Sequence, residues 1–433
     1  MPTLNRRTFL AGALGAAAAP FVIRASALGA GGRASPSDRT TVACVGVGGR
    51  GGGHVRSLLE EKDVQVLAVC DVDTRRRDRN KKAVEDRYSR DAPGTYAGCT
   101  GYNDFRDCVA RPDVDAVVIG TPDHWHALIS IAALRAGKDV YSEKPLALTI
   151  AEGQAMVQAV RRYGRVFQTG TQQRSSSRVR HCCELVRNGR LGRLHTVRTG
   201  VWSWSGPPRC GPTWSPEPVP DGFDYEMWLG PAPWEPYTSG RCGNTFRDIL
   251  DYSGGQITDT GAHVNDIAQW GIGADGSGPV EIEGWAEWPT TGLYNIATKF
   301  ECTFTYANGV RLICMTHSPF GMRFQGDEGW IDVGTNQADP PGILKSTIGP
   351  NEVHLYDTGG ETHMQNFLRC VRTRQDPSAP VEVGHRSTTV SHLGNIAMRL
   401  GRKVKWDPAA ERFVNDPEAD RMLSRAMRAP WHL

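Results

Sequence analysis

The chain has 433 residues, too many for one small hydrophobic core, and a prior of roughly 100 to 200 residues per domain leads us to expect two domains. Its 50 Lys and Arg residues against 47 Asp and Glu residues give a formal charge of only +3, and the longest arginine run is Arg75-Arg76-Arg77. This balance excludes the strongly basic chains that bind nucleic acid or an acidic membrane surface.

Residues 1–30 have the features of an export signal. The arginine pair Arg6-Arg7 precedes an alanine-rich apolar run to Ile23, and Ala25 to Ala27 offer the small residues of a cleavage site. The segment resembles a bacterial twin-arginine signal, which implies passage through that translocation machinery to the periplasm. A membrane anchor is the alternative, but the run is broken by Pro20 and is shorter than the roughly 20 apolar residues that a span needs.

A glycine-rich turn follows the first apolar run, Val42 to Val45. The turn contains Gly46, Gly48, Gly49, Arg50 and Gly51, and an amphipathic segment leads from it to a second apolar run. The pattern predicts strand, turn, helix and strand. Gly46 allows the tight turn, Gly48 lets the backbone approach a pyrophosphate, and Gly51 lets the helix pack closely, while free N–H groups at the helix start face the anion. A dinucleotide site is therefore favoured over an ordinary glycine turn.

The second apolar run, Val64 to Cys70, ends in Asp71, about 20 residues beyond Gly51. A carboxylate at this strand tip accepts hydrogen bonds from the adenosine ribose and repels a 2′-phosphate, which favours NAD. The arginine run at 75–77 points the other way, because guanidinium groups could hold the 2′-phosphate of NADP. We expect NAD and keep NADP as the alternative.

Two further strands end in polar residues at the same predicted sheet edge. The strand from Asp115 to Gly120 leads into Thr121 and Pro122, and the strand from Asp139 to Ser142 leads into Glu143, Lys144 and Pro145. Ligands of doubly wound folds bind at this edge, so we expect Thr121, Pro122, Glu143 and Lys144 at the cofactor. His126 either faces the cofactor as well or is only a histidine at the start of a helix.

The glycine turn, Thr121 to His126 and Glu143-Lys144-Pro145, in this order, resemble the Gfo/Idh/MocA family of glucose–fructose oxidoreductase and inositol dehydrogenase. The resemblance implies an α/β chain: an N-terminal Rossmann domain, which we place at residues 38–165, and a C-terminal α/β domain with a large, mostly antiparallel sheet at residues 166–433. It also implies a homo-oligomer assembled through the open face of that sheet.

The first part of the C-terminal domain supplies candidate substrate contacts. By the resemblance, Gln172 and Arg174 face the cleft between the domains; otherwise they are ordinary loop residues. Residues 205–250 are rich in proline and lack periodicity, which indicates an irregular insertion. The tryptophans of this region form a small core of the insertion or stack on sugar rings. We assign the sugar contact to Trp202 or Trp204, which directly precede the insertion.

A second chemical cluster lies between Gly254 and Trp270. Thr258 or Asp259 can cap a helix to Trp270, and the spacing places Asp259, His263 and Asp266 on one face. A histidine held by a carboxylate is a competent general base, although a simple cap and a core histidine are also compatible with the pattern. The resemblance favours a catalytic role for Asp259 and His263, with the histidine beside the substrate hydroxyl and Lys144 near it. We also assign Asp266, one turn further along, to the substrate. We predict no metal site, because no second histidine is close in sequence.

The remaining sequence patterns predict secondary structure and packing, and no further catalytic residues. Alternating runs between Val280 and Val333 indicate an antiparallel sheet, and a helix at 361–374 is expected to return to the first domain, where Trp406 and Trp431 of the tail dock. Of the 11 cysteines, Cys44 and Cys70 lie in predicted strands as core residues, whereas Cys210 and Cys242 flank a loop-rich stretch and could pair across it.

These features together predict an exported NAD(P)-dependent oxidoreductase that acts on a hydroxyl of a sugar, cyclitol or glycoside. His263, oriented by Asp259, would take the hydroxyl proton, and Lys144 would hydrogen-bond the same oxygen. One alternative is an NAD-dependent glycoside hydrolase or lyase that oxidises its substrate only transiently. A catalytically silent sugar-binding protein is the other alternative, which the presence of Lys144, Asp259 and His263 disfavours.

Overall fold

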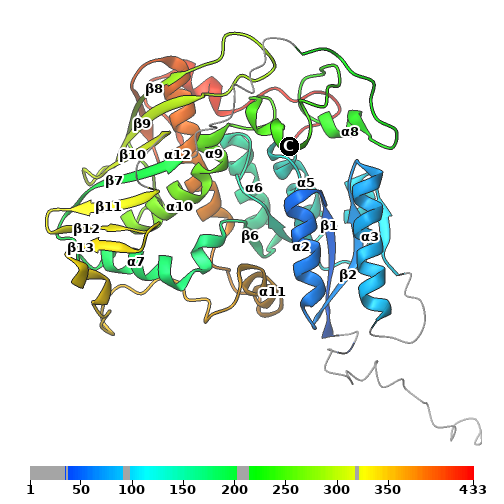
Figure 1. Cartoon of the computed structure of the whole chain (residues 1–433), viewed down its shortest axis with the longest axis horizontal. Helices are drawn as coiled ribbons and strands as arrows, with labels where there is room; N and C mark the ends of the chain where they lie inside the picture. Colours follow the sequence, from blue (N-terminus) through cyan, green and yellow to red (C-terminus); the bar gives the residue numbers. More distant parts are fainter. Residues whose placement is uncertain (1–34, 36–37, 91–97, 202–213, 317–320) are drawn as a thin grey trace, which may run out of the picture.

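The computed structural model describes residue 35 and residues 38–90, 98–201, 214–316 and 321–433, which form two domains side by side (Figure 1). The export signal predicted at residues 1–30, both tryptophans assigned to sugar contact (Trp202 and Trp204) and Cys210 lie outside the described residues. Among the described helices, none combines the length and the hydrophobicity of a transmembrane span.

The first domain is built on a six-stranded parallel sheet of order β3-β2-β1-β4-β5-β6. Its strands are β1 (Thr40–Val45), β2 (Val64–Cys70), β3 (Thr100–Tyr102), β4 (Ala116–Ile119), β5 (Asp139–Ser142) and β6 (Phe167–Thr169). Its helices are α2 (Gly49–Glu60), α3 (Thr74–Ser89), α4 (Phe105–Val109), α5 (Asp123–Arg135) and α6 (Ile150–Tyr163).

The strand order reverses between β1 and β4, whose ends Val45 and Ile119 are paired in register. Ligands of doubly wound sheets bind at such a reversal. The sixth strand, β6, pairs with β5, so the first domain extends at least to Thr169 and not only to residue 165 as expected.

The second domain is built on a nine-stranded sheet of order β13-β12-β11-β7-β10-β9-β8-β14-β15. Its strands are β7 (Leu194–Val201), β8 (Glu281–Glu287), β9 (Lys299–Thr305), β10 (Arg311–Thr316), β11 (Met322–Gly326), β12 (Gly329–Asp332), β13 (Gln337–Asp339), β14 (Val404–Asp407) and β15 (Arg412–Phe413). Only β7 and β10 are parallel neighbours in this sheet, so the predicted fold class is confirmed.

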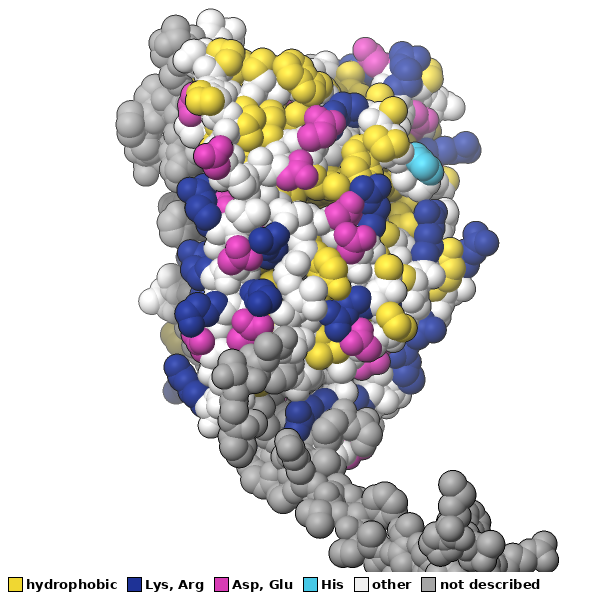
Figure 2. All heavy atoms as spheres, turned by 90° about the vertical axis from the view of Figure 1, so that its right-hand side faces the viewer, with side chains coloured by type: hydrophobic (Ala, Val, Ile, Leu, Met, Phe, Trp, Pro, Cys, Tyr) yellow, Lys and Arg dark blue, Asp and Glu magenta, His cyan; other side chains and the backbone are white. Residues whose placement is uncertain are grey.

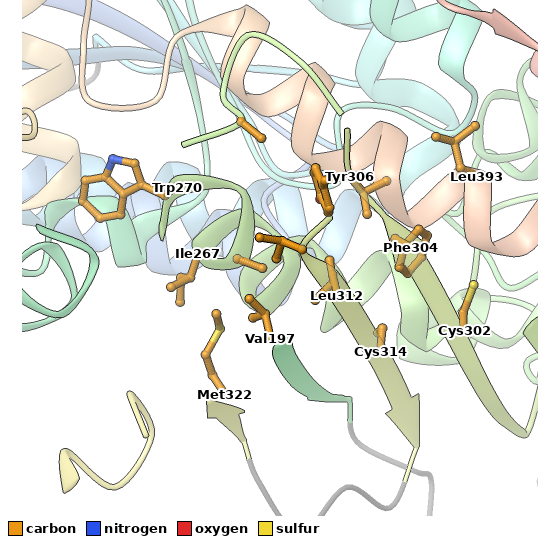
Figure 3. Close-up of a cluster of buried hydrophobic side chains, with 14 of the residues drawn as sticks. Val197, Ile267, Trp270, Cys302, Phe304, Tyr306, Leu312, Cys314, Met322 and Leu393 are labelled. Carbon is orange, nitrogen blue, oxygen red and sulfur yellow. The ribbon is translucent and has the colours of Figure 1, made fainter. Parts of the chain in front are cut away.

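Helices cover one face of this sheet, and their contact with it is the main core of the domain. The covering helices are α7 (Ser177–Arg187), α10 (Gly261–Ile272) and α12 (Val381–Leu400), and the shorter elements are η3 (Gln172–Ser175), α9 (Gln256–Asp259), η5 (Pro341–Lys345), α13 (Pro417–Asp420) and η6 (Arg421–Leu423). Figure 3 shows Ile267 of α10 above Val197, Leu312 and Met322 of the sheet. This packing fixes α10, which carries His263, against a rigid layer.

Two later segments pack against the first domain. Helix α11 (His363–Thr373) buries Met364, Phe367 and Leu368 in the core of the first domain, as predicted for residues 361–374. The insertion, with α8 (Tyr225–Leu229) and η4 (Gly243–Asp248), has a small core of its own and contacts the first domain through the Asp224 N–H and the Val72 carbonyl.

The two tail tryptophans have different surroundings. Trp431 packs edge-on against Trp125 of the first domain, with 4.8 Å between ring centroids, as predicted. Trp406 instead lies in the core of the second domain beside Phe413, because it belongs to β14, so its predicted docking on the first domain is wrong. On the face of the first domain shown in Figure 2, positive and negative side chains are interspersed, in keeping with the small net charge.

Candidate active site

The main cleft lies along the carboxyl ends of the first-domain strands and is closed by the insertion and by α10. Its volume is about 480 Å³, within the usual range for small-molecule sites of about 300–1,000 Å³. The first domain contributes to its lining Gly46, Gly48, Gly49, Arg50, Asp71, Arg76, Asn103, Phe105, Thr121, Pro122, Trp125, Glu143 and Lys144. Later segments contribute Gln172, Met227, Trp228, Gly243, Asn244, Phe246, Arg247, Asp259 and His263.

The glycine turn has the geometry of a pyrophosphate cradle. Gly46 has a φ of 75°, and a Cβ atom on Gly51 would lie 1.8 Å from the Gly46 carbonyl oxygen. Helix α2 begins after Gly48 with no side-chain cap and no acidic residue in its first turn, so its first N–H groups are free for an anion. The residues at this turn therefore fit a dinucleotide.

Asp71 lines the cleft beside this turn and also braces it. Its two carboxylate oxygens accept hydrogen bonds from the backbone N–H groups of Val47 (2.9 Å) and Asp73 (3.0 Å). Burial raises the pKa of Asp71, while these backbone hydrogen bonds oppose that rise. Of the arginine run only Arg76 lines the cleft, where its guanidinium lies close to Gly48.

Thr121 and Pro122 lie in the cleft, but His126 does not line it. The His126 ring is buried, with Nδ1 2.9 Å from the Pro145 carbonyl and Nε2 2.9 Å from the Thr121 carbonyl. Because both ring nitrogens are engaged with backbone, His126 joins the two strand-end turns. The expected contact of His126 with the cofactor is therefore wrong, and its ring instead links the backbone at Thr121 to the backbone at Pro145.

Glu143 organises the wall of the cleft. Its Oε1 accepts hydrogen bonds from Arg50 Nε (3.0 Å), His54 Nε2 (2.7 Å) and Gln172 Nε2 (3.0 Å). Although burial opposes ionisation, the hydrogen bond from His54 and the charge of Arg50 lower the pKa of Glu143 to about 2. An ionised Glu143 thus fixes both Arg50 and Gln172 where they line the cleft.

Lys144 and Asp259 form the chemical centre of the cleft. Lys144 Nζ donates to the Asp259 carboxylate (2.6 Å) and to its backbone carbonyl (2.8 Å), so one further N–H of the ammonium remains for a ligand. Arg247 of the insertion contacts the same carboxylate oxygen at 3.1 Å. Burial opposes ionisation of Asp259, but these two cations hold its pKa below the usual value.

Asp259 therefore does not have the role expected from the sequence. It does not cap the helix, because it is already the last residue of α9, and its carboxylate pairs with Lys144 and Arg247. Thr260 between the two helices keeps helical backbone angles (φ −73°, ψ −37°), and the Asp259 carboxylate lies against Lys144 and Arg247. Asp259 is thus the residue that positions the lysine.

His263 lines the cleft near this centre, on the first turn of α10. Its Nδ1 is buried and has no hydrogen-bond partner among the described residues. Burial and the neighbouring charge of Lys144 lower the pKa of His263 to about 4. The imidazole is therefore neutral at neutral pH and can accept a proton.

Arg174 and Asp266, expected at the substrate, are instead part of the second-domain core. Arg174 Nε lies 2.9 Å from both Asp266 oxygens, and its Nη2 lies 2.7 Å from Asp275. Ser387 also donates to Asp266, at 2.6 Å. Arg174 is 3% exposed and Asp266 is fully buried, so neither side chain can reach a substrate in this structure and the substrate assignment of both is corrected to a structural one.

Sequence reasoning missed the cleft residues that the insertion supplies, above all Arg247. This segment has no periodicity, so no signal indicated which of its side chains turn inward. Its predicted small core is present, with Trp228 buried beside Tyr225 and Tyr252. Among the described residues no group of His, Cys, Asp and Glu side chains is arranged to hold a metal ion.

The fold and the cleft define a two-domain dinucleotide-binding protein. Residues 40–171 match the model of an oxidoreductase family with an NAD-binding Rossmann fold, and residues 176–433 match the C-terminal α/β domain model of the same family. The chain belongs to this family, the Gfo/Idh/MocA oxidoreductases, and its first domain binds NAD.

Three similar proteins illustrate the range of the family. A "Glycosyl hydrolase family 109 protein" of Shewanella baltica is 32% identical over 225 residues, which are 47% of this chain and 44% of that protein. An "Inositol 2-dehydrogenase" of Salmonella agona is 33% identical over 150 residues, 34% of this chain and 41% of that protein. The matches thus span less than half the length of either curated relative.

Among solved structures, the WlbA dehydrogenase of Bordetella pertussis, in complex with NADH and UDP-GlcNAcA, superposes with a TM-score of 0.62 at 16% identity. The superposition covers 85% of this chain and 99% of that one. At this identity the likeness supports the shared fold alone.

Proposed function

We propose that this protein is an exported NAD-dependent oxidoreductase that oxidises a hydroxyl group of a sugar, cyclitol or glycoside. The observation that carries the proposal is the convergence of Lys144, Asp259 and His263 on one cleft that also contains the glycine turn. Export is proposed from the twin-arginine pattern of residues 1–30 alone, and NADP is kept as a second cofactor because Arg76 lies at the ribose end.

Lys144, Asp259 and His263 have different roles in the proposed alcohol oxidation. The neutral His263 ring accepts the hydroxyl proton, and the free N–H of Lys144 hydrogen-bonds the same oxygen and stabilises its developing negative charge. Asp259 keeps the ammonium in place through two hydrogen bonds. When bound, NAD supplies the acceptor for the hydride that leaves the carbon.

Relatives named as glycosyl hydrolase family 109 proteins support a second candidate, a hydrolase or lyase that oxidises a glycoside transiently and restores it. The same residues would then move protons around an elimination step. The conventional dehydrogenase remains the main proposal because Lys144 is present and is fixed in the cleft by Asp259.

The test is a panel of sugars, cyclitols and glycosides offered to the NAD-loaded protein, with reduced nicotinamide and product measured together. The proposal predicts that reduced cofactor and a keto product form in equal amounts. Glycoside cleavage without net reduction would favour the second candidate.

A further inference from the structure

Arg247 reaches the reactive end of the cleft from the insertion. It lies on η4, its guanidinium stacks on the Phe246 ring with 4.6 Å to the centroid, and its Nε lies 3.1 Å from the Asp259 carboxylate. The side chain is 32% exposed and lines the cleft with Lys144 and His263. In the part of the chain that the structure describes, its terminal nitrogens have no hydrogen-bond acceptor, so a two-pronged edge of the guanidinium is available to a ligand.

The two cations at this end of the cleft share one direct carboxylate partner. Lys144 and Arg247 share the single carboxylate of Asp259, and Arg50 is paired with Glu143. Both carboxyl groups have lowered pKa values and are ionised, while His263 is neutral. Asp259 is therefore the direct ion-pair partner of both cations, while the carboxyl groups of Asp123 and Asp248 act on Arg247 as further charges.

Within this pair, Lys144 and Arg247 are suited to different ligands. The ammonium of Lys144 is tied to Asp259 by two hydrogen bonds and has one N–H left, which suits a single hydroxyl oxygen. The planar guanidinium of Arg247 presents two parallel donors, which match a carboxylate. The pyrophosphate of the cofactor has its own donors at the start of α2.

We propose that Arg247 binds a carboxylate of the substrate and that the substrate is a sugar acid, such as a uronic acid, rather than a neutral sugar. This inference rests on the proposed oxidoreductase function and assigns its substrate class. The carboxylate is held and unchanged, while a hydroxyl elsewhere on the ring lies beside Lys144 and His263 and is oxidised to a ketone by transfer of two electrons to bound NAD.

The experiment compares matched pairs, glucose with glucuronate and galactose with galacturonate, in the NAD-loaded protein and its Arg247→Gln variant. We expect the wild type to have a higher kcat/KM for the acid than for the neutral sugar. In Arg247→Gln the ratio of these two kcat/KM values should fall about 10- to 100-fold, mainly because KM for the acid rises when the two-pronged charged contact is lost. A purely structural role would change both substrates equally. The matched control Arg193→Gln removes an exposed arginine outside the cleft and should leave the ratio unchanged.

Equal use of acid and neutral sugars by the wild type, or an unchanged ratio in Arg247→Gln, would overturn the inference and leave the oxidoreductase proposal standing. If no member of the panel reduces bound NAD, the proposed function fails. Calorimetric binding of glucuronate then decides the inference separately: binding that Arg247→Gln weakens supports it, and binding that this variant leaves unchanged overturns it.

Discussion

Replacing Lys144 with glutamine tests the chemical centre most sharply, because the contacts of this lysine are well defined. Lys144→Gln removes the hydrogen bonds of 2.6 and 2.8 Å to Asp259 but leaves Asp259 its second cation, Arg247. The carboxylate is thus not left unpaired, and we expect a loss of only about 1–3 kcal/mol in the free energy of unfolding. The glycine turn and Asp71 are not contacted by Lys144, so NAD content should stay close to that of the wild type.

Turnover should respond far more strongly than stability. Loss of the donor to the reacting oxygen should lower kcat by about 10²- to 10³-fold. The measurements are kcat on the identified substrate, NAD released on denaturation, and urea unfolding. Lys138→Gln is a matched control, because Lys138 is also largely buried and donates to two backbone carbonyls, at 2.6 and 2.8 Å, but does not line the cleft. The control should lose stability and keep its kcat. A Lys144→Gln variant with kcat within threefold of wild type would show that Lys144 does not act on the reacting oxygen.

Three other outcomes are expected. Gly51→Ala should abolish NAD binding in equilibrium dialysis, because its Cβ would lie 1.8 Å from the Gly46 carbonyl oxygen, and normal binding would disprove the cradle. His263→Ala should lower kcat by about 10²- to 10⁴-fold with NAD content unchanged, and a fully active variant would exclude His263 as the base. The free energy of unfolding should fall as the pH drops from 6.5 toward 4. Burial lowers the pKa of His392 to about 4 in the folded state, so in this range the unfolded chain binds more protons than the folded one. His392→Gln should reduce the slope of unfolding free energy against pH by up to about 1.4 kcal/mol per pH unit, whereas the control His432→Gln, at an exposed position, should not.

The first domain could be predicted closely because each of its signals is local. The glycine turn, the apolar strands and the polar residues at strand ends lie in short, continuous segments, and Gly51 and Thr121 lie where these patterns placed them. The boundary was set too early because β6 is only three residues long and its pairing with β5 is a long-range property.

The misjudged residues in the second domain have a common cause. Arg174, Asp259 and Asp266 were assigned roles from helical spacing or from resemblance, but their partners come from distant segments: Asp275 and Ser387 for the buried pair, and Lys144 for Asp259. Spacing along one helix cannot specify which charge another element presents. Arg247 was missed for the same reason, since it lies in a segment without any periodic pattern.

A single turnover distinguishes a net oxidation in the cleft from a transient one. The NAD-loaded protein is mixed with excess substrate, and reduced nicotinamide is followed by absorbance while the product is identified by mass spectrometry. We expect reduced cofactor to rise to one equivalent per NAD-loaded chain and one equivalent of keto product to appear. Adding a keto sugar should then bleach the absorbance. Cleavage of a glycoside with no net reduced cofactor and no keto product would contradict a net oxidation.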